Sequence, residues 1–122
     1  MVKILLLEDD KWLSELESES LRAEGYKVAV VHNGYEAIEK IDDFKPDVII
    51  ADVLLAGSTV FTLLNELQSH GDTQIIPVIL CSSVADQFSI DKLRRYGVVR
   101  VVDKTTMPYG ELSVAVKTAL GG

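Results

Sequence analysis

Five short runs of aliphatic and β-branched residues restrict the fold of this sequence more than any other feature. Each run has the length of a β-strand, and most are almost continuously apolar, which is typical of strands buried on both faces of a parallel sheet. They are Val2–Leu7, Tyr26–Val31, Val48–Ala51, Ile75–Cys81 and Val98–Val102.

Amphipathic stretches with helical spacing lie between the strand-like runs. Apolar residues spaced by three, four or seven positions predict one buried helix face. They include Val60, Leu63, Leu64 and Leu67, and then Leu112, Val116 and Leu120. Residues that begin or end helices fall where this alternation needs them: Gly25, Asn33-Gly34, Lys45-Pro46, Gly97, Thr106 and Pro108.

The alternation predicts an α/β fold of five βα units. Right-handed crossovers place helices on both faces of a parallel sheet, which gives a doubly wound three-layer sandwich. The common strand order for five strands is 2-1-3-4-5. With 122 residues and no linker or repeat, residues 1–122 are expected to form a single domain.

Composition excludes several classes of protein. The formal net charge of −7 disfavours a nucleic-acid surface, and no apolar run reaches the roughly 20 residues of a membrane span. The segment Met1-Val2-Lys3 leads into a run too short and too soon acidic for a signal peptide. One cysteine, Cys81, cannot form an intramolecular disulfide. We expect a cytoplasmic protein without membrane or nucleic-acid contacts.

Polar residues follow the predicted strands at the edge where doubly wound folds bind ligands. They are Glu8, Asp9 and Asp10, then Asp52, then Ser82 and Ser83, and finally Asp103 and Lys104. The second strand ends in Val31-His32 without a carboxylate, which fits an edge strand. In the order 2-1-3-4-5, Asp52 would stand between the acidic run and Ser82.

Two interpretations of these polar residues are open. Carboxylates suit Mg²⁺, and a metal, an ammonium group and a hydroxyl around Asp52 would stabilise a phosphoryl group on that residue. In the simpler interpretation the acidic run only begins a helix, and Asp52 is a loop acid that pairs with Lys104 at the surface.

The sequence resembles the receiver domain of bacterial response regulators along essentially its whole length. The matching segments are "ILLLEDDKWL", "PDVIIADVLLAG", "PVILCSS" and "VVRVVDKT". The resemblance identifies Glu8 and Asp9 with the family's acidic pair, and Asp52 with its phosphoacceptor. Ser82 and Lys104 match the hydroxyl residue and the lysine. It also implies a flavodoxin-like, CheY-like fold.

The resemblance further implies a reaction and its partners. Asp52 would accept a phosphoryl group from a sensor histidine kinase or a histidine phosphotransfer protein. Mg²⁺ would bind through Asp9, Asp52, the backbone carbonyl of Leu54 and, by way of water, Glu8, while Asp10 begins the helix. The domain would catalyse only its own phosphoryl transfer and dephosphorylation, and would not be an enzyme in the usual sense.

A partner surface is implied as well. Many relatives form homodimers or bind output partners through the fourth helix, fifth strand and fifth helix. That face would include Lys92, Arg95, Arg100 and Tyr109. Arg100 also interrupts a predicted edge strand, where a charge hinders strand-to-strand aggregation.

Several residues depart from the family pattern. Thr105 replaces the usual proline after Lys104, and a cis bond before a residue other than proline costs about 2.5 to 4 kcal/mol, so we expect a trans bond. Val101 replaces the aromatic residue of the family's switch, so the signal needs another route or a weaker coupling. Ala56, Val60 and Ser83 replace the usual proline, glycine and small residue.

These departures keep a second function open, namely a receiver-fold protein-binding module that works without phosphorylation. An aspartate-dependent phosphohydrolase is disfavoured because Leu54 stands where a second aspartate is needed. Trp12 is expected to pack at the helix start. His32 and His70 are expected at the surface without acid partners.

Overall fold

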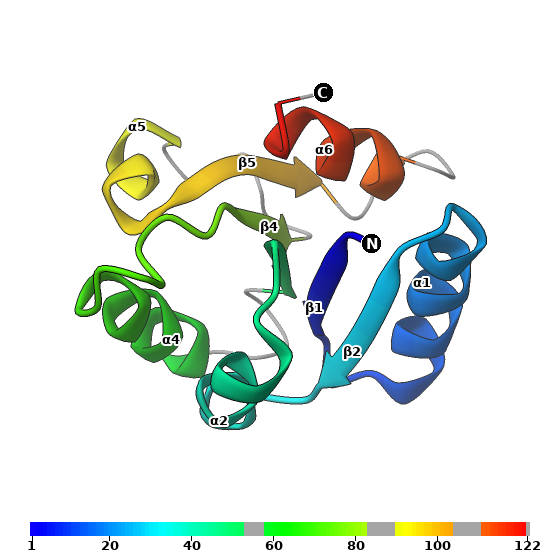
Figure 1. Ribbon diagram of the computed structural model, residues 1–122, viewed down its shortest axis with the longest axis horizontal. Helices are drawn as coiled ribbons and strands as arrows, with labels where there is room; N and C mark the ends of the chain where they lie inside the picture. Colours follow the sequence, from blue (N-terminus) through cyan, green and yellow to red (C-terminus); the bar gives the residue numbers. More distant parts are fainter. Residues whose placement is uncertain (53–57, 83–89, 104–110, 122) are drawn as a thin grey trace.

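The structure, a computed structural model, describes residues 1–52, 58–82, 90–103 and 111–121. At residues 52, 58–60, 82, 90, 92, 103 and 111 it describes the backbone alone. Five parallel strands form one sheet in the order β2-β1-β3-β4-β5, which confirms the predicted fold class (Figure 1). The strands are β1 (Lys3–Leu7), β2 (Lys27–Val31), β3 (Val48–Asp52), β4 (Val78–Ser82) and β5 (Val98–Asp103).

Helices cover both faces of the sheet. They are α1 (Lys11–Ala23), α2 (Gly34–Phe44), α4 (Ser58–Gln68), α5 (Ile90–Leu93) with the 3₁₀ turn η2 (Arg94–Tyr96), and α6 (Glu111–Ala119). Successive side chains of a strand point to opposite faces, so β1 supplies two cores. Leu5 and Leu7 pack with α2 and α4, while Ile4 and Leu6 pack with α1 and α6.

The predicted helix boundaries have clear physical causes. Asp10 caps α1 by accepting a hydrogen bond from the Leu13 amide at 3.0 Å, and Asn33 caps α2 through the Glu36 amide at 2.9 Å. Lys45 ends α2 in the left-handed conformation, with φ of 52°. These contacts confirm the boundaries predicted at both ends of α2 and at the start of α1.

Gly97 ends η2 with φ of 85°, in the left-handed region that glycine adopts without strain. A Cβ at this position would also lie 3.2 Å from Nε2 of Gln68. The carbonyl of Gly97 accepts a hydrogen bond from the Val78 amide at 2.9 Å, so this turn holds the start of β4 beside the start of β5.

The fourth predicted strand was too long at its start. It was predicted from Ile75, but β4 begins at Val78, and Ile75 is 77% exposed. Pro77 has no amide hydrogen to donate to a neighbouring strand, and the Ile76 amide donates instead to the carbonyl of Thr73 at 3.1 Å. Every other strand boundary either agrees with the prediction or differs from it by one residue.

Two apolar side chains are more exposed than predicted. Trp12 was expected to pack at the start of α1, but it is 72% exposed because the inner face of α1 carries Ser14, Glu17, Ser18 and Leu21. Leu120 was assigned to a buried helix face, but it lies beyond the end of α6 and is 38% exposed. The predicted helix start at Thr106 and Pro108 and the side chain of Val60 lie outside the described residues.

Candidate functional site

Strand register brings the carboxyl ends of four strands together. Leu7 of β1 pairs with Ala51 of β3, so Glu8 and Asp52 are the next positions on these two neighbouring strands. On the other side of β3, Asp52 pairs with Cys81 of β4, which precedes Ser82. Chain segments that are far apart in sequence therefore end at one edge of the sheet.

The fifth strand ends at the same edge. Ser82 of β4 pairs with Asp103 of β5, the residue before Lys104. The backbone thus places Glu8, Asp52, Ser82 and Asp103, the residue before Lys104, in the order that the sequence predicted. This is the edge at which doubly wound sheets bind ligands.

The end of β1 presents one buried and one exposed carboxylate. Glu8 is 1% exposed, and its Oε2 accepts a hydrogen bond from the Asp10 amide at 3.3 Å, whereas Asp9 is exposed. The Glu8 amide donates to the carbonyl of Val31 at 3.0 Å, which ties this turn to β2. A buried carboxylate needs hydrogen bonds or an opposite charge to offset its lost hydration, and the Asp10 amide supplies one such contact to Glu8. Oxygen donors of this kind fit Mg²⁺.

Asp10, the third acid of the run, has a different task. Its carboxylate caps α1 through the Leu13 amide, and the carbonyl of Asp10 accepts from the Ser14 amide at 2.9 Å. This confirms the prediction that Asp10 begins the helix.

Several predicted site groups lie outside the described residues. These are the side chains of Asp52 and Ser82 and all atoms of Leu54, Ala56, Ser83, Lys104 and Thr105. Among the side chains that the structure describes, no three from His, Cys, Asp and Glu gather closely enough to hold a metal ion. The complete ligand set therefore stays a prediction.

His32 has a structural role that sequence reasoning missed. Its Nδ1 lies 3.2 Å from the carbonyl oxygen of Glu8, and its amide donates to Oε2 of Glu36 at 3.0 Å. The exposed imidazole therefore connects the turn after β2 to the turn that carries the acidic pair. The sequence held a signal for this contact, because His32 directly follows the strand that pairs with β1.

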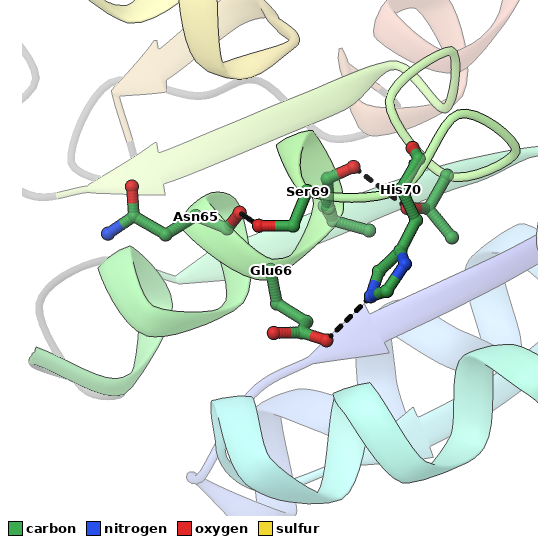
Figure 2. Close-up of polar contacts among 6 residues, drawn as sticks. Asn65, Glu66, Ser69 and His70 are labelled. Atoms are coloured by element: carbon green, nitrogen blue, oxygen red, sulfur yellow. Dashed lines mark hydrogen bonds and ion pairs between the residues drawn. The ribbon is translucent and has the colours of Figure 1, made fainter.

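The prediction that His70 lacks an acid partner was wrong. Its Nε2 lies 3.0 Å from Oε1 of Glu66, as Figure 2 shows. Glu66 lies in the last turn of α4 and His70 lies two residues beyond its end, and a spacing of four positions brings such side chains together. Both side chains are exposed, as predicted for His70.

The predicted partner face is described only in part. Arg95 is exposed and lies over the ring of Tyr96, with its guanidinium carbon 5.1 Å from the ring centre. Arg100 lies in β5, which is an edge strand as predicted. The side chain of Lys92 and all of Tyr109 lie outside the described residues.

Val101, the residue at the position of the family's aromatic switch, is described. It pairs with Leu80 of β4, is partly buried, and packs against the core that α2 and α4 form with the sheet. An aliphatic side chain of this size has no ring that could turn between an inner and an outer position.

Membrane-spanning helices are absent from the described parts of the chain, where none is long and apolar enough to cross a bilayer.

Comparison with known proteins gives consistent matches. The family model described as "Response regulator receiver domain" matches residues 4–117. The response regulator MprA of Mycobacterium ulcerans is 32% identical over 82 residues, which are 67% of this chain and 34% of that protein. The transcriptional regulatory protein CpxR of Klebsiella pneumoniae is 34% identical over 87 residues, 71% of this chain and 37% of that protein. This chain thus spans little more than a third of each relative.

Solved structures agree with the sequence matches. The signal receiver domain of a signal transduction histidine kinase from Syntrophus aciditrophicus is 30% identical, with a TM-score of 0.84, and the match covers 100% of this chain and 92% of that one. The response regulator TrrA from Thermotoga maritima, solved in complex with Mg²⁺ and BeF, is 26% identical, with a TM-score of 0.81, and the match covers 98% and 100%.

Proposed function

This chain belongs to the response regulator receiver domain family of two-component systems, and we propose that it accepts a phosphoryl group on Asp52 in a Mg²⁺-dependent reaction. The observation that carries the proposal is the placement of Glu8 and Asp9 at the end of β1, beside the register position of Asp52 at the end of β3. Acids on adjacent strand ends can share one cation, whereas isolated surface acids cannot.

The reaction moves a phosphoryl group from nitrogen to oxygen. A carboxylate oxygen of Asp52 forms a bond to phosphorus while the P–N bond of a phosphohistidine breaks, and its electron pair stays on the imidazole nitrogen. The donor is a sensor histidine kinase or a histidine phosphotransfer protein. Both the donor protein and the output of the whole polypeptide belong to this proposal.

The acidic pair would hold the metal ion. Asp9, Asp52 and the carbonyl of Leu54 would bind Mg²⁺ directly, and Glu8 would bind it through water. Bound Mg²⁺ neutralises negative charge on the phosphoryl oxygens. The hydrogen bond from the Asp10 amide to Glu8 keeps the buried carboxylate in one orientation before any ligand arrives.

Lys104 and Ser82 complete the proposed site. Lys104 directly follows Asp103, which pairs with Ser82, so both residues belong to strand ends next to β3. The ammonium group would neutralise a phosphoryl oxygen, and the hydroxyl would donate a hydrogen bond to another.

Chemical trapping tests the acceptor residue. The protein is incubated with acetyl phosphate and Mg²⁺, and the acyl phosphate is reduced with borohydride to leave homoserine in place of the acceptor aspartate. Peptide mass spectrometry should find homoserine at position 52. Homoserine at position 9 or 10 instead would overturn the assignment.

A second candidate function is partner binding without phosphorylation. Val101 favours it, because the described β5 carries no aromatic residue at the switch position. In this case an Asp52→Asn variant would bind the output partner as tightly as the natural protein does. Loss of that binding in the variant would support phosphorylation-dependent signalling.

A further inference from the structure

Two adjacent hollows lie between α2, α4 and the turn that leads into β4. One hollow of about 300 Å³ includes Ile38 of α2, Glu66 of α4 and His70 of the turn after α4. A second hollow of about 410 Å³ includes Lys45, Pro46 and Ile75. Ile41, Asp42, Asp72 and Thr73 line both, so the two hollows are adjacent, and we treat them together as one groove.

The groove is apolar inside and acidic at its rim. Ile41 is buried, whereas Ile75 exposes 77% of its surface at the mouth. Four carboxylates line it, those of Asp42, Asp47, Glu66 and Asp72, against one lysine and one histidine. Excess negative charge beside exposed aliphatic surface is complementary to a segment that is both basic and apolar.

Two of these carboxylates are available to a partner. Asp42 and Asp72 are exposed, and neither forms an ion pair within the described ranges. Glu66 already contacts His70, and Figure 2 shows Glu66 on α4 and His70 on the turn that follows this helix. Oδ2 of Asp47 accepts a hydrogen bond from the Lys3 amide at 2.8 Å.

The shape of the groove indicates the form of the partner. It follows the second half of α2 from Ile38 to Lys45, a length of about 10 Å, which equals roughly two turns of a helix. A groove between two helices accepts the apolar face of a third helix, with flanking charges that fix its orientation. We infer that this groove binds a basic amphipathic helix of a partner protein.

The groove lies at the amino-terminal ends of the parallel strands, whereas the candidate phosphorylation site lies at their carboxyl-terminal ends. The turns that line the groove precede β3 and β4, whereas Glu8 and Asp52 lie where β1 and β3 end. A helix in the groove leaves the other edge open, so a phosphohistidine protein and this partner can bind together. The inference does not depend on phosphorylation of Asp52.

A binding titration without any phosphodonor tests the inference. The probe is a fluorescent helical peptide of about 18 residues, with leucine on one face and lysine on the other, at about 0.15 M ionic strength. The first variant, called the groove pair, combines Asp42→Asn and Asp72→Asn and so removes two negative charges. The second variant is Ile75→Ser. Matched controls are Glu15→Gln with Glu19→Gln on the exposed side of α1, and Val114→Ser on α6, where valine is 54% exposed.

We expect the groove pair and Ile75→Ser each to weaken binding about tenfold, and the controls by less than about twofold. Equal weakening by the groove pair and the α1 pair would overturn the inference, because it would show attraction to net charge alone. The inference would also be overturned if the peptide did not bind the natural protein, or if Ile75→Ser left the affinity for the peptide unchanged.

Amide NMR of the natural protein provides a test that needs no variant. Addition of the peptide should shift the amide signals of Ile41, Asp42 and residues 72–76. Shifts confined to residues 8–12 or to β5 would contradict the groove as the binding site. Because no phosphoryl group takes part, failure here leaves the proposed phosphorylation unaffected, and failure of phosphorylation leaves this result unaffected.

Discussion

Asp9 and Asp10 are neighbours of the same chemical type with different surroundings. The carboxylate of Asp10 accepts the Leu13 amide at the start of α1, whereas Asp9 is exposed at the end of β1. This difference separates helix capping from the proposed metal binding at the level of single residues.

Substitution of each acid by alanine should separate the two tasks. Asp10→Ala should lower the free energy of unfolding by about 1 kcal/mol through the lost cap, and leave Mg²⁺ affinity nearly unchanged. Asp9→Ala should remove Mg²⁺ binding and change stability by less than about 0.5 kcal/mol. Urea unfolding and Mg²⁺ titration measure both quantities. An equal loss of stability in the two variants would contradict the assigned cap.

Gly97 supports a second prediction at this scale. Gly97→Ala would force a side chain into the left-handed region and toward Gln68, so it should destabilise the protein by about 1–3 kcal/mol. Gly71→Ala is the control, since an added Cβ there meets no atom within 4 Å and φ is not positive. Thermal unfolding of the two variants compares them, and similar midpoints would contradict the strain at Gly97.

Among the elements, α4 connects the two regions with proposed functions. It begins at Ser58, later in the chain than β3, and ends at Gln68, beside the acidic groove. Its buried face of Leu63, Leu64 and Leu67 packs on the sheet.

Truncation of this buried face should be costly. Leu64 is fully buried, so Leu64→Ala should lower the free energy of unfolding by about 2–5 kcal/mol. Leu16→Ala on α1 removes the same atoms from a side chain that is 40% exposed, and should cost clearly less. Denaturant unfolding measures the loss of free energy of unfolding in both variants. An equal loss would contradict the packing of α4 on the sheet through Leu64.

The elements also show what periodicity can predict. Continuous apolar runs and the capping residues Asp10, Asn33 and Gly97 placed strands and helices nearly to the residue, because each signal has one local cause. Ile75 was misassigned because its β-branched side chain favours a strand, whereas Pro77 has no amide hydrogen for the ladder and the Ile76 amide donates to Thr73 within a turn. Trp12 was misassigned for a similar reason, since the buried face of α1 is built largely from polar residues.

At the scale of the whole molecule, strand order explains why a candidate site could be proposed from the sequence. The order 2-1-3-4-5 brings the ends of β1, β3, β4 and β5 to one end of the sheet, so the residues after these strands could be proposed as a site before any distance was known. The acidic groove could not be predicted in this way. It depends on how α2 and α4 pack together and on the turn after α4, which no sequence period encodes.

Two acidic regions thus lie at opposite ends of one sheet, and only the edge with Glu8 and Asp9 is proposed to carry chemistry. The central claim is that Asp52 is a Mg²⁺-dependent phosphoacceptor. Its most direct test is the intact mass of the protein after incubation with acetyl phosphate, with and without Mg²⁺, for the natural chain and for Asp52→Asn. We predict a gain of one phosphoryl group that requires Mg²⁺ and is absent in the folded variant. No gain in a folded natural protein that binds Mg²⁺, or an equal gain in Asp52→Asn, would contradict the claim.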